Sequence, residues 1–355
     1  MMSFVRETAW RAYRKIEERE HRLQYLFLEI TRRCNLRCIH CGSDCSNERR
    51  TGELTTDSWI KIIDYVKDRF GTGLTFVLSG GEPLVHPEFF RIAGHIAEIG
   101  MPWGLVTNGM TLDGKLMDRL MAARIGSITL SVDGRETSHN FLRNDRRAFA
   151  AMTRALAAIG NSGVPLCDAV TCVHPGNIGE LDQVAELLIE KKMPAWRLFR
   201  IFPNGRADRD TRLHLSAEQT DRMLDWIAAN RPRYKARGLS VSASCEGYVP
   251  FKRDQTIRDH PFFCRAGINI AGILCDGTIT GCTNNHEGFA QGNILRDDLA
   301  TVWEQRFDDF RSRRWVDTTD CRTCRHLSKC RGGSIHLWRM GDKNPRFCYV
   351  PERDR

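Results

Sequence analysis

One repeating unit limits the possible folds of this chain more than any other feature of its sequence. From Leu26 to about Asn204, short apolar runs alternate with amphipathic segments of helical length, which is the pattern of parallel βαβ units. With right-handed crossovers, such units form either an open sheet or a partial barrel, and both carry their sites at the C-terminal ends of the strands. The six predicted strands are Leu26–Thr31, Leu74–Ser79, Trp103–Asn108, Ser127–Val132, Cys167–Val173 and Trp196–Ile201.

This periodicity stops after a last predicted helix over Ser216–Asn230, and the density of cysteines then rises. Eight of the 14 cysteines lie from Cys245 onward. The C-terminal part has few long apolar runs, so we expect metal crosslinks to stabilise it. The sequence therefore predicts an α/β protein with an N-terminal helical segment (1–23), a (β/α)6 partial TIM barrel (24–235) and a small cysteine-rich module (236–355).

The ends and the composition of the chain narrow its class. No continuous apolar segment of a secretory signal opens it, and no stretch approaches the roughly 18 apolar residues of a membrane span. We therefore expect the cytoplasm, a reducing compartment in which cysteines serve as metal ligands or catalysts. The net charge is +9, but the basic residues are scattered along the chain, so no nucleic-acid partner is expected.

Directly after the first predicted strand, Cys34, Cys38 and Cys41 form a C-x3-C-x2-C run. A cubane [4Fe–4S] cluster normally takes four thiolates. Three ligands would leave one iron open to bind a small molecule, as a catalytic zinc keeps one position vacant. A zinc knuckle completed by His40 or Cys45 is the alternative interpretation.

Short polar segments end the next three predicted strands and should lie on the same rim as the cysteines. Adjacent glycines allow the backbone to approach a ligand closely, and the glutamate that follows adds an acceptor for a cation. Plain turns are the alternative for these segments. The candidate residues are Gly80, Gly81, Glu82, Asn108, Ser131 and Asp133.

Together, the cysteine run and these rim motifs resemble the radical S-adenosylmethionine (AdoMet) superfamily. The resemblance implies a [4Fe–4S] cluster that chelates AdoMet and cleaves it reductively to a 5′-deoxyadenosyl radical, which abstracts hydrogen from a substrate. It further implies that the Gly-Gly-Glu segment binds the AdoMet amino group and that Ser131 lies near the ribose and carboxylate. Arg143 is similar to an arginine that pairs with the AdoMet carboxylate; a solvated arginine is the alternative.

The C-terminal cysteines resemble a SPASM extension, which carries one or two auxiliary iron–sulfur clusters. In that pattern Cys321, Cys324, Cys330 and Cys348 form a complete ligand set, for which zinc is the structural alternative. Cys264 and Cys282 would begin a further set, but Ser334 stands where the pattern has a cysteine. Either Cys245 or Cys275 substitutes for it, or this cluster is three-coordinated, smaller or absent. Asp276 is a weaker catalytic candidate, with a hairpin turn as the alternative.

Three functions follow from these motifs. We expect a peptide maturase, in which the module binds a peptide or protein substrate and a flavodoxin- or ferredoxin-type protein supplies electrons. The rival enzyme would act on a small cofactor precursor, such as a tetrapyrrole or quinone precursor. A non-catalytic iron–sulfur or zinc carrier is the third reading, but a carrier does not need the rim motifs.

Overall fold

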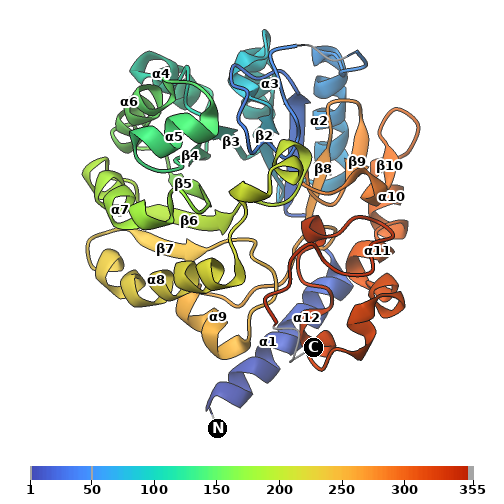
Figure 1. Ribbon diagram of the computed structural model, residues 1–355. Helices are drawn as coiled ribbons and strands as arrows, with labels where there is room; N and C mark the ends of the chain where they lie inside the picture. Colours follow the sequence, from blue (N-terminus) through green and yellow to red (C-terminus); the bar gives the residue numbers. More distant parts are fainter. Residues whose placement is uncertain (1, 49–50, 351–355) are drawn as a thin grey trace.

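One 10-stranded sheet forms the centre of the computed structural model, which describes residues 2–48 and 51–350 (Figure 1). Residues 1 and 351–355, at the outer ends of the predicted parts, lie outside the described residues. The strand order is β10-β9-β8-β1-β2-β3-β4-β5-β6-β7. The strands are β1 (Tyr25–Thr31), β2 (Thr75–Gly80), β3 (Trp103–Thr107), β4 (Ser127–Ser131), β5 (Leu166–Val173), β6 (Ala195–Arg200), β7 (Ser240–Ala243), β8 (Ile270–Ile273), β9 (Thr278–Thr280) and β10 (Gly292–Asn293).

Helices surround the outside of the curved parallel part of the sheet, and α1 lies beside the C-terminal segment (Figure 1). The helices are α1 (Met2–Glu20), α2 (Thr56–Phe70), α3 (Phe89–Glu98), α4 (Gly114–Ala122), α5 (Glu136–Arg143), α6 (Ala148–Gly160), α7 (Leu181–Glu190), α8 (Ala217–Lys235), α9 (Phe251–Ile257), α10 (Leu299–Gln305), α11 (Asp308–Arg311) and α12 (Leu327–Cys330).

All six strands predicted from the sequence form, as β1 to β6, and they pair in parallel in chain order. Local residues define where the first connecting helix begins and ends. In α2, the hydroxyl of Thr55 accepts a hydrogen bond from the N–H of Ser58, and Gly71 ends the helix. Trp59 and Ile63 of this helix are fully buried against the sheet, so burial of its apolar face stabilises the βα unit. The predicted partial barrel is confirmed.

The sheet continues into the segment predicted as the module. Strand β7 pairs in parallel with β6, and β8 pairs in parallel with β1, so they extend the parallel sheet on both sides. The β9 and β10 strands then pair antiparallel beyond β8. Trp303 and Trp338 belong to the same hydrophobic core as Trp59. The C-terminal segment is therefore packed into the barrel instead of folding around a separate core.

No helix among the described residues is long and apolar enough to cross a membrane.

Candidate active site

The cysteine loop after β1 faces a cavity of about 740 Å³ at the C-terminal ends of the strands. Cys34, Cys38 and Cys41 all line this cavity. The parallel strands bring the predicted rim to the same place, because their carboxyl ends share one edge. Five of the predicted rim residues line the cavity with the cysteines: Gly80, Gly81, Asn108, Ser131 and Arg143.

Two of the three sulfurs receive hydrogen bonds from neutral donors. The Sγ of Cys34 accepts from the N–H of Leu36 at 3.4 Å and from Nδ2 of Asn108 at 3.7 Å. The Sγ of Cys41 accepts from the N–H of Cys45 at 3.4 Å. A hydrogen bond from the Cys45 thiol lowers the pKa of Cys41 to about 5, whereas burial raises that of Cys34 to about 12. Such donors stabilise the thiolate form that binds iron.

The spacing of the sulfurs fits a cluster better than a single zinc ion. A tetrahedral zinc ion holds its thiolates about 3.8 Å apart, because each Zn–S bond is about 2.3 Å. Across residues 2–48 and 51–350, only His40, Asp133 and Cys172 bring three ligand atoms within 4.8 Å of one another. The sulfurs of the three loop cysteines are thus not all within 4.8 Å of one another. Thiolates that bind different irons of a cubane stand farther apart than thiolates around one zinc ion.

The Gly-Gly-Glu segment at the end of β2 packs directly against the backbone of the cysteine loop. A side chain at Gly81 would collide with the carbonyl oxygen of Arg33, so only glycine allows this approach. The N–H of Glu82 donates to the same oxygen at 2.9 Å. The Glu82 carboxylate does not line the cavity: it is buried and accepts from Thr107 Oγ1 at 2.8 Å and Asn108 N–H at 2.7 Å. Burial raises its pKa to about 7.

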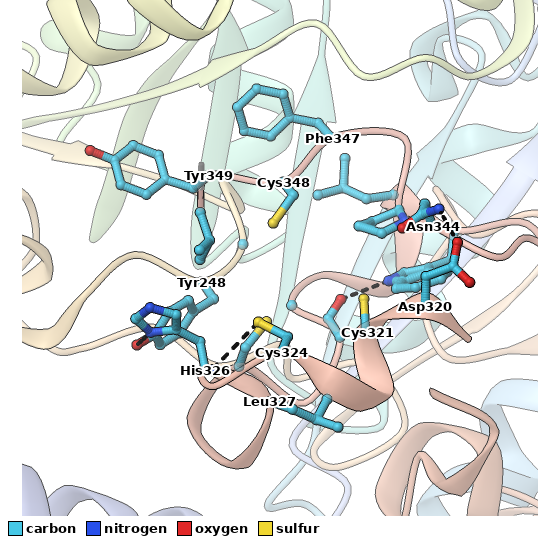
Figure 2. A pocket seen from close by; sticks show the side chains of 18 of the residues that line it. Tyr248, Asp320, Cys321, Cys324, His326, Leu327, Asn344, Phe347, Cys348 and Tyr349 are labelled. Atoms are coloured by element: carbon cyan, nitrogen blue, oxygen red, sulfur yellow. Dashed lines mark hydrogen bonds between the residues drawn. The ribbon is translucent and has the colours of Figure 1, made fainter. Parts of the chain in front are cut away.

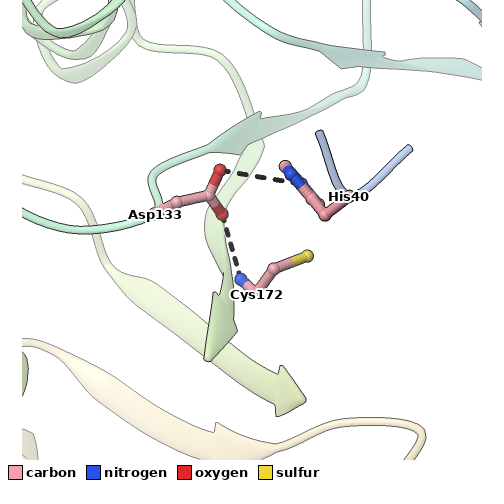
Figure 3. A group of neighbouring side chains, drawn as sticks. All are labelled: His40, Asp133 and Cys172. Atoms are coloured by element: carbon pink, nitrogen blue, oxygen red, sulfur yellow. Dashed lines mark hydrogen bonds and ion pairs between the residues drawn. The ribbon is translucent and has the colours of Figure 1, made fainter. Parts of the chain in front are cut away.

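Asp133 also lies behind the cavity wall, where His40 and Cys172 approach it (Figure 3). Its Oδ1 accepts from the N–H of Cys172 at 3.0 Å, and its Oδ2 is 3.9 Å from Nε2 of His40. Nη2 of Arg143 lies 2.6 Å from the same Oδ2. Burial alone would raise the pKa of Asp133, but the guanidinium holds it below its ordinary value. Because the guanidinium of Arg143 already pairs with the Asp133 carboxylate, His40, Asp133 and Cys172 do not form a metal-ion site.

Two family models match the chain in the regions just described. The model of the radical SAM superfamily matches residues 28–188, which include the cysteine loop and the rim. The model of the SPASM iron–sulfur cluster-binding domain matches residues 264–325. The chain belongs to the radical SAM superfamily. It is therefore an enzyme that uses a [4Fe–4S] cluster and AdoMet, and its SPASM domain carries auxiliary clusters.

Relatives of this radical SAM enzyme match it along most of its length. An AdoMet-dependent heme synthase from Methanosarcina barkeri is 27% identical over 86% of this chain and 89% of its own length. A mycofactocin maturase, MftC, from Mycobacterium ulcerans is 29% identical over 91% of this chain and 86% of its own length. Among relatives of similar identity, one is thus named for a small molecule and another for a maturase.

Solved structures show the same fold. SuiB from Streptococcus suis, bound to S-adenosylmethionine, has a TM-score of 0.69 and 17% identity, and the match covers 92% of this chain and 76% of that one. The anSMEcpe structure with AdoMet and the Kp18Cys peptide has a TM-score of 0.70 and 18% identity, with 92% and 93% covered. These likenesses support the partial barrel followed by a SPASM domain.

The complete set of C-terminal cysteines in the SPASM domain surrounds a second pocket. Figure 2 shows the sulfurs of Cys321, Cys324 and Cys348 turned toward the same space, and Cys330 lines it as well. Burial, together with the neighbouring thiolates of Cys348 and Cys321, raises the pKa of Cys330 to about 12. Binding iron relieves this repulsion, because the metal neutralises the thiolates. These four residues fit one auxiliary cluster.

Cys245, and not Cys275, lies with the incomplete pair. Burial and the nearby Cys264 raise the pKa of Cys245. Burial, with Cys245 and Cys264 as neighbours, raises the pKa of Cys282 to about 12. Ser334 is fully buried, and its hydroxyl donates to the backbone oxygen of Cys245 at 3.2 Å. Cys245, Cys264, Cys282 and Ser334 thus bring three thiols and one hydroxyl to the incomplete set.

Cys275 and Asp276 take part in backbone hydrogen bonds and lie away from the incomplete cysteine set. The N–H of Cys275 donates to the buried carboxylate of Glu29 at 3.4 Å, on the neighbouring strand β1. Asp276 is exposed in the turn between β8 and β9, where its Oδ1 accepts from the N–H of Thr278 at 2.9 Å. It does not line the cavity. The hairpin-turn alternative explains Asp276, and we do not retain it as a catalytic candidate.

Sequence reasoning missed several residues that complete the cavity. Glu29 is a charged residue in an otherwise apolar strand, and this contrast was the available signal. The others lie farther along the chain, and no local pattern links them to the cysteine loop. These further lining residues are Arg209, Thr283, Asn284, Asn285, His286, Glu287 and Arg339.

Proposed function

We propose that this radical SAM enzyme is a peptide maturase that modifies a peptide or protein substrate in the 740 Å³ cavity. Cys34, Cys38 and Cys41 would hold the [4Fe–4S] cluster and leave it one site for AdoMet. When bound, the two cofactors supply a hydrogen-abstracting radical. The chain's own contribution is to hold them at the C-terminal ends of the strands, beside a cavity wide enough for a segment of substrate.

The rim residues orient AdoMet in this proposal. Gly80 and Gly81 bring the end of β2 against the cysteine loop, so backbone oxygens there meet the amino group. Asn108 and Ser131 line the cavity from the ends of β3 and β4 and contribute polar groups. Glu82 acts from behind: by accepting the Asn108 N–H at 2.7 Å, its carboxylate fixes the backbone on which Asn108 stands.

The observation that carries the peptide assignment is the polar mouth of the cavity. Asn204 after β6 and Asn284 and Asn285 in the SPASM domain all line it. An asparagine amide donates and accepts hydrogen bonds in the same way as a peptide group. Phe199 and Phe202 stack at 5.5 Å on one wall and offer an apolar surface for a substrate side chain. This combination suits a polypeptide, and the maturase relative supports it.

The SPASM domain has two roles in the proposal. The cluster at Cys321, Cys324, Cys330 and Cys348 passes electrons between the reaction and a flavodoxin- or ferredoxin-type donor. A second auxiliary cluster uses Cys245, Cys264 and Cys282, with Ser334 in place of a fourth thiolate. The module predicted over 236–355 also supplies Asn284 and Asn285 to the cavity, so it contributes directly to substrate binding.

A small-molecule substrate is the second candidate, because the heme synthase relative is 27% identical along most of both chains. An apolar wall and several arginines would suit a flat ring system that carries carboxylates. A peptide substrate and a small-molecule substrate predict that different added molecules increase the rate of AdoMet cleavage.

The test uses anaerobically reconstituted holoenzyme with AdoMet and dithionite. 5′-Deoxyadenosine is measured alone, with a short peptide encoded beside the gene, and with Fe-coproporphyrin III. We expect the peptide to increase the rate and to change in mass. An increase with the porphyrin and none with the peptide would replace the proposal by the second candidate. Absence of 5′-deoxyadenosine under all three conditions would contradict both.

A further inference from the structure

The three sulfurs proposed to bind the barrel cluster differ in their hydrogen-bond donors. Those at Cys34 and Cys41 receive only neutral groups. The Sγ of Cys38 instead accepts from Nη1 of Arg143, at 3.8 Å. Hydrogen bonds from charged donors are roughly twice as strong as those between neutral groups. Cys38 therefore differs from its two neighbours in having a charged hydrogen-bond donor, although the guanidinium of Arg206 also acts on Cys41 through space.

Asp133 holds the arginine in this position. Nη2 of Arg143, at the end of α5, lies 2.6 Å from Oδ2 of Asp133. Asp133 is itself fixed: its Oδ1 accepts from Cys172 N–H at 3.0 Å, its own N–H donates to His139 Nδ1 at 3.0 Å, and its backbone oxygen accepts from Asn177 Nδ2 at 2.6 Å. The arginine cannot swing away without leaving a buried carboxylate unpaired, which would be costly.

Both partners are removed from water. Asp133 is 0% exposed and Arg143 is 8% exposed. Charges interact more strongly where water does not screen them. Reduction of an iron–sulfur cluster adds negative charge, and hydrogen bonds to its sulfurs are among the features that set its potential. A guanidinium beside one sulfur therefore stabilises the reduced state.

The contact with Cys38 uses only part of the donor capacity of the arginine. A guanidinium has five N–H groups, two on each Nη, and one Nη faces Cys38 while the other faces Asp133. Nε is buried without a hydrogen-bond partner. Because Arg143 lines the cavity, the contact with Cys38 adds to the family expectation that Arg143 pairs with the AdoMet carboxylate.

Resting on the proposed function, in which Cys38 binds the barrel cluster, we propose that Arg143 raises the reduction potential of that cluster through its hydrogen bond to Cys38. Asp133 is the positioning residue that keeps the guanidinium against the sulfur. The role is electrostatic and precedes AdoMet binding. It makes the cluster easier for a physiological donor to reduce.

The test is a potentiometric titration of reconstituted holoenzyme, followed by electron paramagnetic resonance without AdoMet. The barrel cluster is identified by the change that AdoMet causes in its signal. We compare wild type with R143M, which removes charge and donor, and with R143Q, which keeps a neutral N–H donor. The matched control is R147M, four residues along the chain from Arg143, which removes the exposed guanidinium that pairs with Asp145. AdoMet affinity is measured on the oxidised proteins.

We expect R143M to shift the midpoint potential to a lower value, R143Q to shift it by a smaller amount, and R147M to leave it unchanged. The AdoMet affinity of the oxidised variants shows separately whether the arginine also contacts the cofactor. If R143M assembles no cluster, R143Q is compared with wild type. Unchanged potentials in the Arg143 variants would overturn the inference, whatever their AdoMet affinity. An absence of any AdoMet-sensitive cluster in wild type would instead contradict the proposed function.

Discussion

The barrel and the C-terminal cysteine region hold their thiols in opposite ways. In the barrel, the loop with Cys34, Cys38 and Cys41 rests on strands whose large side chains, such as Phe76 and Trp103, are almost completely buried. The region from Leu299 to Val350 has a helix of seven residues and two of four. Isolated helices shorter than about 12 residues are marginal in water. The barrel thus supports its cluster, whereas we expect the auxiliary cluster to support its own surroundings.

The largest effect should follow from removing the loop thiols. The triple variant C34A/C38A/C41A should lose all 5′-deoxyadenosine release, because no iron is left to bind AdoMet. Its thermal unfolding should stay near that of wild type, since the barrel core is untouched. C167A is the matched control, because Cys167 lies on β5 and does not line the cavity. Release of 5′-deoxyadenosine by the triple variant would contradict the cluster assignment.

The second effect should separate folding from catalysis in the C-terminal region. The variant C321A/C324A should lose about one cluster's iron and become sensitive to limited proteolysis between residues 299 and 350. AdoMet cleavage without substrate should persist, because these cysteines line a different pocket from the loop cysteines. Turnover of substrate should fall. Proteolysis at wild-type rates would show that the auxiliary cluster does not support the local structure.

A smaller effect should appear where the two regions touch. His336 packs against Phe202 with ring centroids 3.9 Å apart, and burial lowers its pKa to about 3. The unfolded chain takes up a proton below about pH 6.5, but the native state does not, so stability falls as pH falls. Between pH 7 and pH 5.5, wild type should lose about 1 kcal/mol more than H336F, by anaerobic urea unfolding. Equal losses in the two proteins would contradict this assignment.

The smallest effect should come from the contact of α1 with the C-terminal region. Lys329 Nζ lies 2.6 Å from Glu7 Oε1, and their side chains are 42% and 22% exposed. Exposed ion pairs contribute roughly 0.2–1 kcal/mol. K329M should therefore reduce the unfolding free energy by less than about 1 kcal/mol, with a smaller loss at high salt. A loss of several kcal/mol would mean that α1 is a structural support of the C-terminal region.

The sequence predicted the barrel well because its signals are local. Each of the strands β1 to β6 is an apolar run followed by a helix, and some of these helices begin at a capping side chain, as at Thr55, Asp113 and Ser216. Strands β7 and β8 were missed, because Ser240–Ala243 and Ile270–Ile273 are only four residues long. The pairing of β8 with β1 joins residues that are far apart along the chain. No local pattern predicts such a pairing.

The candidate site shows the same division. The loop cysteines and Gly81 were found because their spacing and their place after a strand are visible in the sequence. The contact of Arg143 with Asp133 and Cys38 depends on how α5 packs over the sheet, which periodicity does not reveal. The choice of Cys245 over Cys275 likewise depends on where β7 ends.

Electron paramagnetic resonance of the dithionite-reduced holoenzyme, with and without AdoMet, tests the central claim most directly. We compare wild type, C34A/C38A/C41A and C321A/C324A, each with its iron and sulfide content measured. The account predicts that AdoMet changes one cluster signal in wild type and in C321A/C324A, and changes none in the triple variant. An AdoMet-sensitive signal that survives in C34A/C38A/C41A, or that disappears only in C321A/C324A, would contradict it.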